Sequence, residues 1–267
     1  EDVERRIQHN LLQRFSLGKR MAINHGSLLR DFGTLGSTDA TNQLFDGEYI
    51  FPPNHDSYTE EFLSEAARIK QTTDMPPNST SFVTTEDFVR FWTKANELTS
   101  SSKSGRHFGH YKAIAHDRYL SALEAAKLSL AASTGIPMDR WGSALTVLLE
   151  KEFGNIYLEK MRAICLLEAD FNWLNKLIFA KRMMDQAYDN GMVPVEQFAR
   201  RGTQASSGVL CKVLFCDMVR ALHEMAGIPS VDLGNCYDAV AHPIASIALQ
   251  AFQVPLATIV LSLSVLQ

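Results

Sequence analysis

The sequence predicts a helix-rich α+β protein. Over most of the chain, apolar residues recur at the three- and four-residue spacing of amphipathic helices. Only three short apolar runs have the length of strands, at residues 145–149, 164–167 and 228–233. With 267 residues, 46% of them hydrophobic, the chain can bury a sizeable core in one large domain or two small ones.

The charge composition argues mildly against a free-standing nucleic-acid-binding protein. The chain has 26 basic and 30 acidic residues, a net charge of −4 and a pI near 6.1. Most such proteins are basic, so contact with a polyanion must come from local patches. No apolar run is long enough to span a bilayer and no signal peptide is recognisable, so we expect a soluble, intracellular protein of unassigned compartment.

The cysteine spacings fit neither a zinc ribbon nor a disulfide framework. This pattern indicates that the cysteines are small, buried hydrophobic residues of a protein in a reducing compartment. The four residues are Cys165, Cys211, Cys216 and Cys236.

Residues 1–80 have the pattern of an irregular region with short helices, because glycines and two Pro-Pro pairs interrupt it. One polar helix is expected at residues 58–70. The chain begins with Glu1 rather than methionine, which indicates a fragment or a trimmed polypeptide.

The next helix is predicted to start at Thr84 or Thr85, ahead of Glu86 and Asp87. A second helix is predicted at residues 113–132, which are rich in Ala, Leu, Lys and Glu. The apolar face of the first helix is expected to lie in the core and comprises Phe88, Phe91, Trp92, Ala95 and Leu98.

A polar loop with two glycines lies between these helices and reads T-S-S-S-K-S-G-R-H-F-G-H-Y at residues 99–111. Its charged or titratable side chains could contact phosphates, together with free backbone amides. They are Lys103, Arg106, His107 and His110. With His116, the histidines give only a poor zinc ligand set, because no cysteine or closely placed acid accompanies them.

Two apolar runs with a turn between them, and with basic residues on or beside them, predict a flap that can close on a triphosphate. The run at residues 145–149 is a strand or a helix end, and the run at 164–167 is its partner strand. Arg162 and Lys151 stand beside these runs, and guanidinium forks neutralise phosphate oxygens well. The alternative for Arg162 is a solvated charge at a strand edge.

Further helices are predicted at residues 174–186, at 207–225 and from Pro243, and a last apolar helix at 256–267. Between the first two, Arg200 and Arg201 either face nucleic-acid phosphates or form a solvated turn. One face of the helix at 207–225 carries Leu210, Val213, Leu214, Met218, Ala221, Leu222 and Met225.

A buried strand at residues 228–233 would place Asp232 at its C-terminal end, where an acid can meet a metal ion. Asp and Asn near glycine are also ordinary turn formers, so the alternative is a solvated turn. The surrounding segment, residues 230–242, reads S-V-D-L-G-N-C-Y-D-A-V-A-H.

Four segments, in this order, resemble reverse transcriptases of non-LTR, LINE-like retroelements: S-G-R-H-F-G-H-Y-K, M-R-A-I-C-L-L, E-Q-F-A-R-R-G and D-L-G-N-C-Y-D. The resemblance covers about residues 80–267. It implies a partial right-hand polymerase, with fingers plus the first palm strand and helices, and an incomplete palm sheet. The implied regions are an irregular N-terminal region at 1–80, a fingers-like region at 81–200 and a truncated start of the palm at 201–267.

The resemblance also implies roles for single residues. Asp232 would be a catalytic residue and a ligand of two Mg²⁺ ions, Leu233 would offer its backbone carbonyl, and Tyr237 would lie under the incoming sugar. Arg162 would bind the triphosphate, with Lys151 as a weaker candidate.

The remaining roles concern nucleic acid. The loop that carries Lys103, Arg106, His107 and His110 would touch the template. Arg200 and Arg201 would face template or primer phosphates.

The implied function is RNA-directed DNA polymerisation by two-metal nucleotidyl transfer, with an RNA template, a DNA primer, deoxynucleotide triphosphates and Mg²⁺. Such a site needs a second carboxylate cluster, and residues 243–267 contain no acid. We therefore expect a fragment of such an enzyme that is inactive when alone. The alternatives are a nucleic-acid-binding module, a non-functional retroelement remnant, and an unrelated helical interaction domain.

Overall fold

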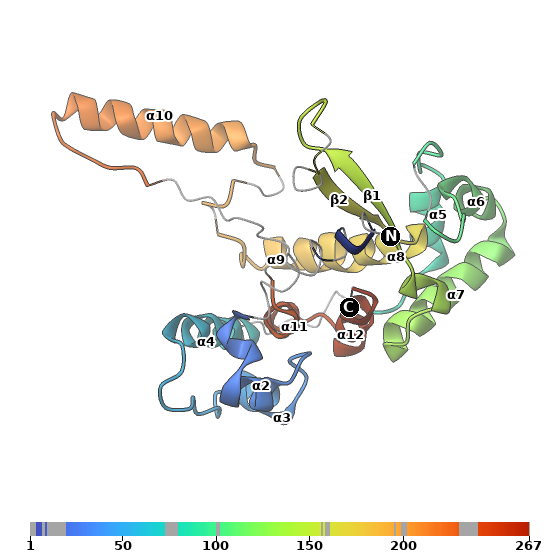
Figure 1. Cartoon of the computed structure of the whole chain (residues 1–267), viewed down its shortest axis with the longest axis horizontal. Coiled ribbons are helices and arrows are strands. Elements are labelled where there is room, and N and C mark those ends of the chain that lie inside the picture. Colours follow the sequence, from blue (N-terminus) through green and yellow to red (C-terminus); the bar gives the residue numbers. More distant parts are fainter. Residues whose placement is uncertain are drawn as a thin grey trace.

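The computed structural model describes residues 4–6, 9, 20–72, 80–99, 102–155, 157, 161–194, 196–198, 202–229 and 240–266. Within them the chain is rich in helices and has a single two-stranded antiparallel sheet (Figure 1). The prediction of a helix-rich α+β protein is confirmed. None of the helices in these segments combines the length and the apolar character needed to cross a membrane.

The first hydrophobic core joins the N-terminal helices to a helix near the other end of the chain. These elements are η2 (Ala22–Asn24), α2 (Gly26–Phe32), α3 (Asp39–Asp46), α4 (Ser57–Thr72) and α11 (His242–Ala251). Ile247 and Ala251 of α11 pack with Phe32 and Leu63, all at most 1% exposed. The polar helix predicted at 58–70 is confirmed as α4.

The second core is larger and aromatic. Its elements are α5 (Thr85–Trp92), α6 (Phe108–Ile114), α7 (Arg118–Thr134), η3 (Asp139–Gly142), α8 (Ala169–Asn175), the π-helix η5 (Lys176–Met183) and α12 (Leu256–Val265). Helix α9 (Met184–Asp189) follows η5. The Trp92 ring lies at its centre, with centroids 4.6 Å from Tyr111 and 5.9 Å from Trp173. Aromatic pairs at these distances are favourable beyond the area they bury.

Local sequence signals set the start of α5. Thr84 is its N-cap: the Thr84 hydroxyl accepts from the Asp87 amide at 3.0 Å, and the Asp87 carboxylate accepts from the Thr84 amide. This capping box confirms the predicted helix start. Phe88 and Trp92 are fully buried as expected, but Leu98 is 92% exposed, because α5 ends at Trp92 and the predicted face does not continue.

The single helix predicted at residues 113–132 is wrong, because the chain forms α6 and α7 there. Asp117 separates them by capping α7, and its carboxylate accepts from the amides of Tyr119 at 2.8 Å and Leu120 at 2.9 Å. An aspartate that binds the backbone in this way favours a new helix start over a continuous helix.

The predicted flap is an antiparallel hairpin of β1 (Leu145–Glu150) and β2 (Met161–Leu166). Residues 145–149 are therefore a strand and not a helix end. The hairpin projects from the helical body (Figure 1). By the pairing register, one face of the hairpin carries Leu145, Leu149 and Ile164. These side chains are 46, 46 and 37% exposed, so the described chain leaves this face largely uncovered.

Helix α10 (Ala205–Ala221) carries no buried residue. Figure 1 shows it as a rod apart from the other helices. Its predicted apolar face is exposed, with Leu210, Val213, Leu214 and Met218 between 49 and 58% accessible. A helix that is apolar on most of its surface normally lies inside a larger structure.

The expectation that the cysteines are buried is wrong for Cys165 and Cys211, which are exposed, and Cys216 is only partly covered. The physical reason is their location, since the residues that the structure describes pack little against β2 and bury no residue of α10. Cys236 lies outside the described residues.

We predict that Gly36→Ala destabilises the protein more than Gly154→Ala. Both glycines have positive φ, 57° and 81°, so a side chain costs about 1 kcal/mol at either position. A Cβ at Gly36 would lie 2.9 Å from the Pro243 carbonyl oxygen and 2.9 Å from Ile247 of α11, whereas a Cβ at Gly154 meets no atom within 4 Å. Overpacking at Gly36 adds roughly 1–3 kcal/mol. Urea denaturation of both variants measures the difference, and equal losses would contradict the packing of α11.

Candidate nucleic-acid interface

Two acidic residues are buried where β2 leads into α8. Glu168 is the N-cap of α8 and is 1% exposed, and Asp170 lies in the first turn and is fully buried. A buried carboxylate is costly unless it is hydrogen-bonded and paired with a cation. The partners of these two groups therefore determine what the region does.

Asp170 is held by three groups. Its carboxylate pairs with the Arg140 guanidinium and accepts hydrogen bonds from the Trp141 indole N–H and the Phe171 amide, both at 3.0 Å. Burial lowers the pKa of Arg140, but the carboxylates of Asp170 and Glu168 outweigh this effect, so the pKa lies above its ordinary value. The guanidinium is therefore charged and compensates the buried acids.

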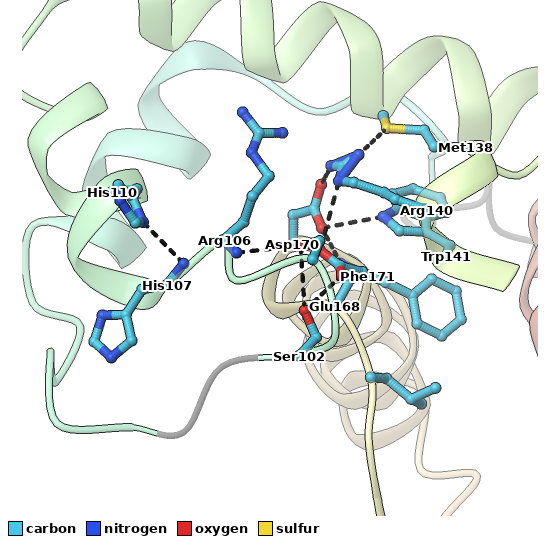
Figure 2. A network of polar contacts seen from close by, with 12 residues as sticks. Ser102, Arg106, His107, His110, Met138, Arg140, Trp141, Glu168, Asp170 and Phe171 are labelled. Atoms are coloured by element: carbon cyan, nitrogen blue, oxygen red, sulfur yellow. Dashed lines mark hydrogen bonds and ion pairs between the residues drawn. The ribbon is translucent and has the colours of Figure 1, made fainter. Parts of the chain in front are cut away.

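Glu168 binds a loop that lies far away in sequence. The Ser102 hydroxyl donates to its Oε1 at 2.5 Å and the Ser104 hydroxyl donates to its Oε2 at 2.9 Å, across 66 and 64 residues. Arg140 Nε lies 3.5 Å from Oε2. Figure 2 shows Ser102 on one side of the two carboxylates and Arg140 on the other. The polar loop is thereby attached to the base of the hairpin.

The attached loop has a defined backbone. The Gly105 amide donates to the Ser102 carbonyl at 3.1 Å, and the Arg106 amide donates to the Ser104 hydroxyl at 3.1 Å. The start of α6 follows at once. His107 Nδ1 accepts from the Gly109 amide at 3.1 Å, and His110 Nδ1 accepts from the His107 amide at 2.9 Å.

The structure divides the four predicted loop residues into two pairs. Lys103 and His110 are exposed, while Arg106 and His107 are half-buried. The Arg106 guanidinium lies 5.3 Å from the centre of the Tyr111 ring and 3.5 Å from the Glu124 carboxylate. It points away from Glu168 (Figure 2). In this arrangement Arg106 stabilises the loop, and Lys103 is the cation that faces solvent.

The two hairpin residues are both exposed. Arg162 lies in β2 opposite Leu149, and Lys151 directly follows β1 in the turn. Glu168 is two residues beyond the end of β2, so the strand that carries Arg162 leads directly to the carboxylate that binds the loop. The other predicted site residues lie outside the described residues: Asp232, Leu233, Tyr237, Arg200 and Arg201.

The described part of the chain contains no group of three or more histidine, cysteine, aspartate or glutamate residues that could hold a metal ion. Glu168 and Asp170 do not fit Mg²⁺, because Arg140 and the serines already occupy their oxygens. The expected magnesium ligand, Asp232, is outside the described ranges.

The chain matches no protein family, no curated protein and no solved structure.

The buried network of Arg140, Glu168 and Asp170 was not predicted from the sequence. A usable signal was present, since Glu168 and Asp170 directly follow the apolar run of β2 and precede the aromatic start of α8. Charged residues inside an apolar stretch indicate buried and paired groups, because unpaired charges are not tolerated there.

We predict that Arg140→Met lowers the free energy of unfolding by about 3–5 kcal/mol, because it leaves buried carboxylates without their cation. Arg68→Met is the matched control. Arg68 also pairs with a carboxylate, that of Glu65, but its side chain is 63% exposed, and we expect no measurable change. Thermal and urea unfolding of both variants tests this, and similar small losses would show that the network adds little to stability.

Proposed function

We propose that the chain is part of an RNA-directed DNA polymerase of the non-LTR reverse transcriptase type, and that the described region binds its nucleic acid and nucleotide. One observation carries the proposal. The loop at residues 102–110 and the hairpin that carries Arg162, both of which the sequence predicts to contact phosphates, are joined through the buried Glu168. Two remote polyanion-binding segments that share one anchor support a common ligand.

The exposed cations suit this ligand. Lys103 offers a mobile point charge for the template backbone, and His110 lies exposed on the same segment. Arg162 offers a planar guanidinium, the group that pairs best with triphosphate oxygens, and Lys151 lies in the adjoining turn. These local charges contact polyanions despite the overall net charge of −4.

The remaining assignments belong to the same proposal. Mg²⁺, held by Asp232, would supply charge neutralisation for nucleotidyl transfer. Leu233 and Tyr237 would contact the incoming nucleotide, and Arg200 and Arg201 the template or primer.

A second candidate function is supported by α10. A helix without any buried residue and with an apolar surface favours a protein-interaction domain. The two functions differ in their dependence on salt, because phosphate contacts weaken steeply as ionic strength rises.

We predict that the chain binds single-stranded RNA and that Lys103→Ala and Arg162→Ala each weaken binding. Each substitution removes roughly one phosphate contact and should reduce the slope of log affinity against log salt by about one. Fluorescence anisotropy with labelled RNA over a range of salt concentrations measures both quantities.

Arg68→Ala is the control for this experiment. Arg68 is an exposed arginine on α4, a helix that packs in the N-terminal core and not in the aromatic one, and its loss should change neither affinity nor slope. RNA binding that does not depend on salt would contradict the proposal. Equal losses of affinity in Arg68→Ala and Arg162→Ala would contradict it as well.

A separate prediction concerns Asp232. Deoxynucleotide triphosphate should bind more tightly with Mg²⁺ than without it, and Asp232→Asn should remove that difference while the metal-independent binding through Arg162 persists. Isothermal titration with and without Mg²⁺ tests this. If the metal effect survives in Asp232→Asn, Asp232 is not the ligand.

A further inference from the structure

Glu168 uses both of its carboxylate oxygens within the protein. One accepts from Ser102, and the other accepts from Ser104 and faces Arg140. The side chain is buried, so it cannot touch a ligand itself. Its contacts nevertheless determine where the loop at residues 102–110 lies.

The loop needs such an anchor. It contains Gly105 with a φ of 71°, and Lys103, Ser104 and Gly105 are exposed. Exposed loops with small polar residues are mobile unless side-chain or backbone contacts hold them. The two serine contacts hold the turn on both sides of Lys103, and hydrogen bonds to an ionised carboxylate are about twice as strong as neutral ones.

The anchor also fixes the loop relative to the hairpin. Glu168 follows Leu166, the last residue of β2, by two positions, and Arg140 holds both Glu168 and Asp170 at the start of α8. A shift of β2 therefore moves the carboxylate that the serines bind.

We propose that Glu168 is a positioning residue, which fixes the loop at residues 102–110 against the base of the β1–β2 hairpin. If the proposed function holds, on which this consequence rests, Glu168 keeps Lys103 and Arg162 at the fixed separation that one nucleic-acid ligand requires. The charge of Glu168 matters as well as its shape, because an amide would turn one acceptor oxygen into a donor that faces Arg140.

The first experiment is independent of any ligand. Hydrogen exchange of the full chain is followed in peptides that cover the loop, the hairpin and α7. In Glu168→Gln the amides of Gly105 and Arg106, which donate within the anchored turn, should exchange roughly tenfold to a hundredfold faster, while those of α7 stay unchanged. Glu65→Gln, which alters an exposed ion pair on α4, should leave the loop unchanged.

Ser104→Ala covers the possibility that Glu168→Gln disturbs folding. Ser104 is exposed, so its hydroxyl can be removed without leaving a cavity in the core. It should accelerate exchange of the Gly105 amide, which donates to the Ser102 carbonyl, by a smaller factor, because the Ser102 contact with Glu168 remains. The Arg106 amide is left out of this comparison, because the Ser104 hydroxyl is its own acceptor. Unchanged loop exchange in folded Glu168→Gln and in Ser104→Ala would overturn the assignment of Glu168.

The second experiment separates positioning from simple stabilisation. Lys103→Ala is combined with Glu168→Gln, and RNA affinity is measured for all four proteins. Lys103→Ala should weaken binding several-fold in the original chain but less than about twofold in the Glu168→Gln background, because the loop no longer holds Lys103 in place. Arg162→Ala should have the same effect in both backgrounds.

The outcomes distinguish this inference from the proposed function. If RNA binds but Lys103→Ala is equally harmful in both backgrounds, Glu168 does not position the loop, while the proposed function stands. If RNA does not bind at all, the proposed function fails, and loop exchange alone decides whether Glu168 anchors the loop.

Discussion

The need to compensate two buried carboxylates organises this structure. Glu168 and Asp170 lie where a strand becomes a helix, and neither can remain charged there without donors and a cation. Arg140 supplies the cation, Trp141 and Phe171 donate to Asp170, and the serines of a distant loop complete the shell of Glu168. The hairpin, α8, η3 and the polar loop therefore meet at one point.

The base of the hairpin is held at this point, because Glu168 and Asp170 directly follow β2 and are bound by Arg140. A two-stranded sheet is marginally stable by itself, and the face with Leu145, Leu149 and Ile164 has little cover in the described chain. Helix α10 also has apolar side chains that the described chain leaves exposed, and none of its residues is buried.

The features that sequence could predict are those that local chemistry determines. Thr84 and Asp87 form a capping box from neighbouring residues, and the hairpin follows from two short apolar runs separated by a turn. Exposure of Leu98 follows from the end of α5 at Trp92, six residues earlier than the apolar pattern predicts. Exposure of α10 was not predictable, because periodicity shows that a face is apolar but not whether another element covers it.

In the candidate site, too, the residue types could be predicted from the sequence, but the tertiary contacts between them could not. The cationic residues Lys103, Lys151 and Arg162 were identifiable by type, and they are exposed. Their common anchor was not identifiable, because Ser102 and Glu168 are 66 residues apart and only tertiary structure brings them together. Arg106 shows the converse, since a residue predicted to bind phosphate packs against Tyr111 and Glu124.

Both hydrophobic cores are completed by helices late in the sequence, and this affects folding during synthesis. Ile247 and Ala251 of α11 complete the N-terminal core, whereas Ile259 and Leu261 of α12, a few residues later, complete the aromatic one. During synthesis on a ribosome, residues 22–69, which hold the N-terminal part of the first core, emerge long before the helix that closes this core. The apolar side chains of this N-terminal segment therefore remain exposed, and accessible to chaperones, until almost the whole of this sequence has been translated.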